Sequence, residues 1–185
     1  MANHARKIEA RATLITLMLR EDHQKVRQLF DQFHETTNTY EKRDIVAAAL
    51  AALEILVTLK EELIYPAWRE RVDEPDLVDE ALKEHHVVHM LIKELTNMNP
   101  EDKRYSPTLA ALGEYVQHSI NEEERKMFPL AEKADLDWER LTTHVVARRQ
   151  SLEHKTLWLL GVPVMVSASK TVCATRAVFF GRVGS

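Results

Sequence analysis

The chain contains one sequence pattern twice. In residues 22–66, and again in residues 84–129, an acidic residue precedes a His, and much later a Glu-rich stretch ends in an aromatic residue followed by Pro. His23 in the first copy corresponds to His85 in the second. Self-similarity of this kind indicates that one supersecondary unit is used twice. We therefore expect the two histidines to occupy equivalent places in the fold and to have equivalent roles.

The composition favours a helical, soluble domain. The 185 residues are 45% hydrophobic and 29% charged and include only four Gly, and this length suits one domain. Few glycines among many Ala, Leu, Glu and Lys residues is typical of helices. The net charge is -4 with both signs interspersed, so the chain has no extended basic face and we do not expect nucleic acid as a partner.

The single Cys and the N-terminus bear on the compartment. Cys173 has no second Cys to pair with, which excludes an intramolecular disulfide and a Cys-built zinc or iron-sulfur site. The N-terminus carries no apolar signal segment. Both features lead us to expect a cytoplasmic protein.

Apolar residues recur at spacings of three and four in four long segments, which predicts four amphipathic helices. They cover about residues 8–34, 41–71, 76–97 and 107–133, and short stretches of turn-forming residues separate them. Short connections make neighbouring helices antiparallel. The predicted fold is all-α, an up-down-up-down four-helix bundle over residues 8–150.

Residues 151–185 are expected to form a C-terminal tail. Its charge-free run, residues 156–169, is shorter than the roughly 20 residues that a helix needs to span a bilayer. We interpret the tail as a packed irregular segment. A membrane-contacting or partner-binding role and a divergent or expression-derived C-terminus are the alternatives.

Each predicted helix places at least one polar residue at mid-height of its apolar face. Because these faces point to the bundle axis, the residues should meet in one layer. The layer consists of His23, Leu56, Lys60, His85, Ser119 and Glu123. Imidazole and carboxylate groups that converge in a bundle core are typical metal ligands, so we regard this layer as the candidate site.

Four stretches resemble the four helices of the hemerythrin-like HHE cation-binding family: "LREDHQKVRQLFDQF", "LKEELIYPAWRE", "VDEALKEHHVVHMLIKEL" and "LGEYVQHSINEEERKMFP". The resemblance covers about residues 14–150. It implies a non-haem di-iron centre with His on the first and third helices and His-x-x-x-Glu on the second and fourth. The two carboxylates of that pattern bridge the irons.

The chain matches this ligand pattern only in part. His23 and His85 match the ligands of the first and third helices, and Glu123 matches the bridging carboxylate of the fourth. Three ligand positions are replaced, and they hold Leu56, Lys60 and Ser119. The resemblance therefore implies a centre that has lost two imidazoles and one bridging carboxylate.

A Lys at a bridging position carries positive charge where the metal would lie. In a low-dielectric core that repulsion is costly, so Lys60 and metal are alternatives. Without metal, Glu123 would be a buried charge without compensation, and Lys60 on the facing helix can pair with it. We predict a structural ion pair between Lys60 and Glu123.

Other arrangements remain open from the sequence. Lys60 could snorkel to solvent along its aliphatic stem. A rotation or a π-bulge in the fourth helix could turn His118 and Glu122 inward as possible ligands, instead of Ser119 and Glu123. His89 could join His85 as an i, i+4 metal-binding pair, and Glu61 could reach inward if the second helix is over-wound.

These readings lead to three functional hypotheses. The first is a hemerythrin-like protein that is metal-free or holds non-haem iron at partial occupancy, and that binds or senses rather than catalyses. In the second, His23, His85 and Glu123 hold one or two metal ions for dioxygen, nitric oxide or peroxide chemistry. The third is an enzyme whose nucleophile is Lys60, which would require a desolvated amine without a partner.

Overall fold

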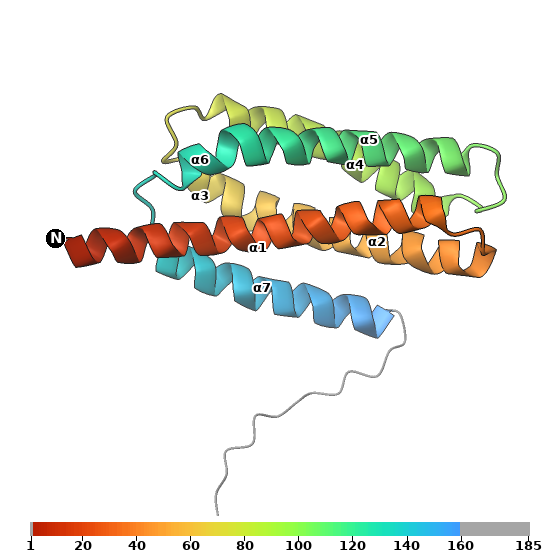
Figure 1. Cartoon of the computed structure of the whole chain (residues 1–185), viewed down its shortest axis with the longest axis horizontal. Helices are drawn as coiled ribbons and strands as arrows, with labels where there is room; N and C mark the ends of the chain where they lie inside the picture. Colours follow the sequence, from red (N-terminus) through yellow and green to blue (C-terminus); the bar gives the residue numbers. More distant parts are fainter. Residues whose placement is uncertain (1, 160–185) are drawn as a thin grey trace, which may run out of the picture.

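The computed structural model describes residues 2–159, with side chains from residue 14 to residue 156. This part of the chain is helical and contains no strand (Figure 1), which confirms the predicted all-α bundle. The elements in chain order are α1 (Ala2–Glu35), α2 (Thr39–Leu59), η1 (Lys60–Ile64), α3 (Tyr65–Arg69), α4 (Asp76–Asn97), α5 (Tyr105–Glu122), η2 (Glu123–Met127), α6 (Phe128–Ala131) and α7 (Trp138–Leu159).

Two of the four bundle helices are interrupted at equivalent places by a π-turn. The Tyr65 N–H donates to the Lys60 carbonyl, and the Phe128 N–H donates to the Glu123 carbonyl, so each turn spans five residues. A Pro follows each aromatic residue. Proline has no N–H and clashes with the carbonyl one turn earlier, and a wider turn accommodates it. The π-turns thus begin at Lys60 and Glu123, the two predicted partners.

A fifth helix, α7, is present where the sequence analysis predicted none. It lies along α1 and α2, on the side away from α4 and α5 (Figure 1). Trp138 and Val145 are buried on its inner face. The Arg149 Nη1 atom donates a hydrogen bond to the Asp22 Oδ1 atom at 2.8 Å. The helix therefore covers the flank of α1 that carries the residue before His23.

Helix α7 also bears on the expected C-terminal tail. It continues to Leu159, so the expected boundary at residue 150 falls inside a helix. Residues 160–185, which include most of the apolar run, lie outside the described residues. None of the helices in residues 2–159 is long and apolar enough to cross a membrane.

Candidate functional site

The six residues of the predicted layer are buried, and each exposes at most 5% of its surface. They come from four helices: α1, α2 with its π-turn η1, α4, and α5 with its π-turn η2. The residues are His23, Leu56, Lys60, His85, Ser119 and Glu123. The apolar spacing in the sequence predicted that these side chains point inward, and the structure places all of them in the core.

Lys60 lies at the centre of the layer. Its Nζ atom is 2.7 Å from Oε1 and 2.6 Å from Oε2 of Glu123, and 3.1 Å from Nε2 of His23. An ammonium group has three N–H donors, and here three acceptors surround it. Only 2% of Lys60 is exposed, so the alternative in which it snorkels to solvent is wrong.

His23 joins the Lys60–Glu123 pair to a second carboxylate. Its Nδ1 atom is 2.8 Å from Oε1 of Glu124, and its ring stacks on Phe128 with centroids 5.7 Å apart. An ionised carboxylate only accepts hydrogen bonds, so Nδ1 carries the proton. The lone pair of Nε2 therefore faces the ammonium of Lys60. This is the tautomer in which a histidine binds a cation through Nε2.

His85 has matching contacts on the other side of the layer. Its Nδ1 atom is 3.1 Å from Oε1 of Glu61, and its ring stacks on Tyr65 with centroids 5.2 Å apart. Its Nε2 atom lies 3.4 Å from the Tyr65 hydroxyl, which donates to Glu123 at 2.7 Å. His85 is thus connected to Glu123 through Tyr65, whereas His23 is connected through Lys60.

The contacts of the two histidines show how the duplicated units fit together. The histidine of each copy bonds to a Glu and stacks on an aromatic residue of the other copy. In both cases the Glu is the second residue of the π-turn and the aromatic residue follows the turn. Each copy therefore supplies the residues that hold the histidine of the other copy, and neither copy could form the site alone.

Charge and burial determine the protonation states of the central groups. Burial raises the pKa of Glu123, but the charge of Lys60 and the close polar contacts with His23 and His85 outweigh burial and hold the pKa well below its ordinary value. Burial, and then the charge of Glu123, raises the pKa of Tyr65 well above its ordinary value. At neutral pH the layer therefore contains a carboxylate and a neutral phenol.

The lowered pKa of Glu123 predicts acid sensitivity. A carboxyl group with a lower pKa in the folded state contributes stability above its unfolded pKa, and loses it as the pH falls through the folded pKa. We expect the free energy of unfolding to fall as the pH decreases below about 4.5, the ordinary pKa of this group. Urea unfolding at a series of pH values measures this free energy. The acid-dependent loss should be smaller in Glu123→Gln, and equal losses in both proteins would contradict the prediction.

The alternative pair on the fourth helix points outward. The side chain of His118 is 66% exposed, and Glu122 forms ion pairs with Arg125 and Lys126 on the surface. The π-turn begins at Glu123, after this pair, so it does not rotate the pair inward. The interpretation of His118 and Glu122 as ligands in the core is wrong.

Glu61 and His89 lie at the edge of the layer. The carboxylate of Glu61 bonds to Nδ1 of His85 and, through both oxygens at 3.2 Å, to Nε2 of His89. Its hydrogen bond from His85 contributes most to lowering the pKa of Glu61. Within the described part of the chain, no group of three or more His, Cys, Asp or Glu side chains is arranged to hold a metal ion.

Sequence reasoning did not assign roles to Tyr65 and Glu124. The signal was present in the duplication, because Glu124 aligns with Glu61 and Tyr65 aligns with Phe128. The second alignment also marks the difference between the copies, since Tyr has a hydroxyl where Phe has none. That hydroxyl is the group that reaches Glu123.

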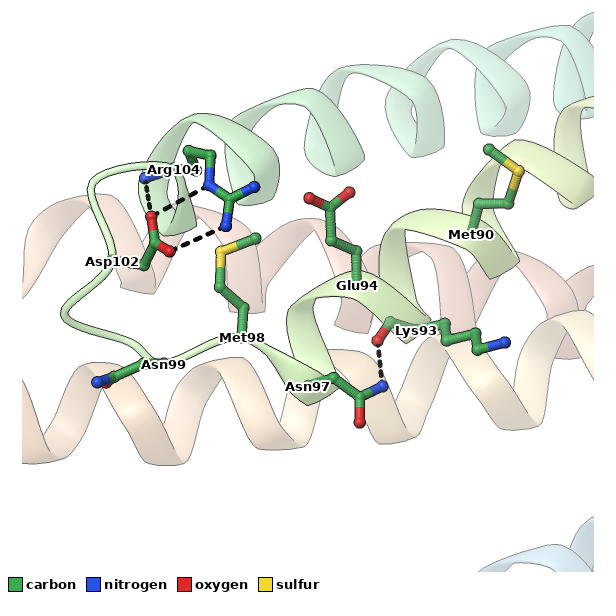
Figure 2. A pocket seen from close by; sticks show the side chains of 8 residues that line it. All are labelled: Met90, Lys93, Glu94, Asn97, Met98, Asn99, Asp102 and Arg104. Atoms are coloured by element: carbon green, nitrogen blue, oxygen red, sulfur yellow. Dashed lines mark hydrogen bonds and ion pairs between the residues drawn. The ribbon is translucent and has the colours of Figure 1, made fainter.

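A surface hollow of about 540 Å³ lies between the C-terminal part of α4 and the loop that leads to α5, and it contains none of the layer residues (Figure 2). Two pairs of its lining residues bond to each other. The Arg104 guanidinium donates to Asp102 at 3.0 Å, and the Asn97 amide donates to the Lys93 carbonyl at 2.7 Å. The hollow offers no cluster of convergent groups comparable to the buried layer.

Comparison with known proteins agrees with the fold and with the family resemblance of the sequence. The family model "Hemerythrin HHE cation binding domain" matches residues 14–131. A solved structure, a hemerythrin HHE cation binding domain-containing protein from Mycobacterium kansasii, is similar with a TM-score of 0.65. It is 24% identical, and the match covers 77% of this chain and 89% of that one. None of the curated proteins matches the chain. The chain belongs to the hemerythrin HHE cation-binding domain family.

Proposed function

We propose that this protein is a member of the hemerythrin family in which Lys60 replaces the metal of the di-iron centre. In this proposal the protein acts by binding or sensing and does not use metal chemistry. The observation that carries the proposal is the position of the Lys60 Nζ atom, which lies within hydrogen-bond distance of both the Glu123 carboxylate and Nε2 of His23.

The residues of the layer do not fit the di-iron pattern of the family. A carboxylate-imidazole iron site needs several N and O donors that also neutralise the metal charge. Here Leu56 and Ser119 occupy the two missing imidazole positions, and Lys60 brings a positive charge in place of a carboxylate. Two of the three donors that remain already accept hydrogen bonds from the ammonium of Lys60, namely Glu123 and His23.

A second candidate function keeps the metal, and the family membership favours it. The Glu123 carboxylate lies close to both histidines. Its Oε2 atom is 3.4 Å from Nε2 of His23, and its Oε1 atom is 3.8 Å from Nε2 of His85. One iron or zinc ion at these donors would have open positions for dioxygen, nitric oxide or peroxide. It would first have to displace the ammonium of Lys60.

The third hypothesis, an enzyme with Lys60 as nucleophile, has less support. A Schiff-base lysine attacks through the lone pair of a free amine, whereas Nζ of Lys60 is engaged with three acceptors. The cavity beside Glu123 has a volume of about 20 Å³. This is too little for a carbonyl substrate of several atoms.

Metal analysis separates the first two functions. We expect protein purified from iron-supplemented cells to contain far less than one iron per chain, because Lys60 holds the position of the metal. Elemental analysis measures the iron, and the absorption spectrum should lack an oxo-bridged charge-transfer band. Two irons per chain with that band would overturn the proposal. One metal ion per chain that is lost in the variant His85→Ala would support the second function.

A further inference from the structure

A small cavity lies directly beside the buried layer. Its volume is about 20 Å³, and the buried residues Ser119, Glu123, Ala81 and Met127 line it together with charged side chains nearer the surface, namely Glu80, Glu84, Glu122 and Lys126. The cavity follows from the unequal replacement of two equivalent positions. Leu56 fills its place in the core on one side, whereas the short side chain of Ser119 does not fill the corresponding place on the other.

The two buried polar residues at this cavity, Ser119 and Glu123, have unused hydrogen-bonding capacity. Within residues 14–156, the Ser119 Oγ atom is buried and has no hydrogen-bond partner. The Glu123 carboxylate has about four acceptor positions. Three are used, two by Lys60 and one by Tyr65. A buried hydroxyl without a partner is costly, and native proteins satisfy such groups with ordered water.

We infer that the cavity is a binding site for one ordered water molecule, which bridges Ser119 Oγ and the remaining acceptor position of Glu123. A water needs roughly 10 to 15 Å³ of accessible volume and two to four polar partners, and apolar cavities stay dry. The volume of about 20 Å³ is sufficient. The serine hydroxyl can both donate and accept, and the carboxylate accepts the second proton of the water.

This water would complete the hydrogen bonding of the layer. It takes the place that an imidazole would occupy in the family pattern and gives the fourth acceptor position of Glu123 a donor. The inference does not depend on the proposed function, because the cavity, the unpaired hydroxyl and the open acceptor position are present whether or not the protein binds a partner. Failure of either proposal can therefore be recognised separately.

The direct test is magnetisation transfer from water to methyl groups. The full chain is labelled with ¹³C at the methyl groups of Met and Ala, and nuclear Overhauser effects from water are recorded. We expect cross-peaks to Met127 and Ala81, both of which line the cavity, with the sign of a water that stays longer than nanoseconds. Absence of these cross-peaks in the folded protein would overturn the inference.

Two substitutions at Ser119 give an independent result. Ser119→Val fills the cavity with carbon, and Ser119→Ala removes only the hydroxyl. If a bound water bonds to Ser119, both variants should unfold a few degrees lower and lose the water cross-peaks. A control, Ser106→Val, makes the same change at an exposed position of α5 and should keep them. Retention of the cross-peaks in Ser119→Val, or a higher unfolding temperature in both Ser119 variants, would show that the hydroxyl holds no water.

Discussion

Replacement of Lys60 by Met should lower the free energy of unfolding by about 3 to 5 kcal/mol, because it leaves the buried charge of Glu123 without a compensating positive charge. Lys60 contributes two hydrogen bonds to this carboxylate, and both residues are 2% exposed. Met has a similar length and is apolar, so the change removes the charge with little change in volume. Urea unfolding at neutral pH, followed by circular dichroism, measures the loss.

Two further variants make this result specific to the ion pair. Lys25→Met makes the same change at an exposed position of α1 and should alter stability by no more than about 0.5 kcal/mol. The double variant Lys60→Met with Glu123→Leu should be more stable than Lys60→Met alone, since it removes both charges. An unchanged stability of Lys60→Met would mean that the ion pair is absent in solution.

Restoration of the three replaced ligands should change the iron content from nearly none to two irons per chain. The triple variant carries Leu56→His, Lys60→Glu and Ser119→His. All three positions are buried in the layer with His23, His85 and Glu123, so the variant rebuilds the ligand pattern that the family resemblance implies. The cavity beside Ser119 supplies part of the volume for one imidazole. Elemental analysis and the absorption spectrum after anaerobic loading with ferrous iron measure the result.

The matched control for the restoration of the iron ligands retains Lys60. A double variant with Leu56→His and Ser119→His has both imidazoles and still places an ammonium at the bridging position. It should not hold two irons, because the positive charge and the metal exclude each other. A triple variant that folds with native helix content but binds no iron would show that the three positions do not point at a common centre.

Several features of the fold could be predicted from the sequence with good accuracy. The spacing of apolar residues predicted a helix over residues 76–97, and α4 has these bounds. The predicted second and fourth helices also exist, although each is divided by a π-turn. Helix α7 was not predicted, because its apolar stripe is short: only Trp138, Leu141 and Val145 recur at helical spacing and are buried, and polar or charged residues make up most of the remaining segment. It becomes stable by packing on α1 and α2, which a local pattern does not reveal.

The candidate site was less predictable than the fold. The duplication singled out His23 and His85, and helix spacing identified the residues that face the core. Spacing alone could not decide between Ser119 with Glu123 and His118 with Glu122, because these pairs lie only one residue apart on the helix. The structure decides this, since the π-turn begins at Glu123 and leaves the preceding helical turn unrotated.

By itself, the sequence determined which side chains are directed to the bundle axis, because the 3.6-residue period of a helix sets one face. It also offered Lys60 as the candidate partner of Glu123, while leaving open that this lysine reaches solvent. Only the tertiary structure decided that each histidine is held by a Glu and an aromatic residue of the other copy, and that the Tyr65 hydroxyl reaches Glu123. These contacts join residues of different helices, and their geometry depends on how the helices pack, which no local spacing encodes.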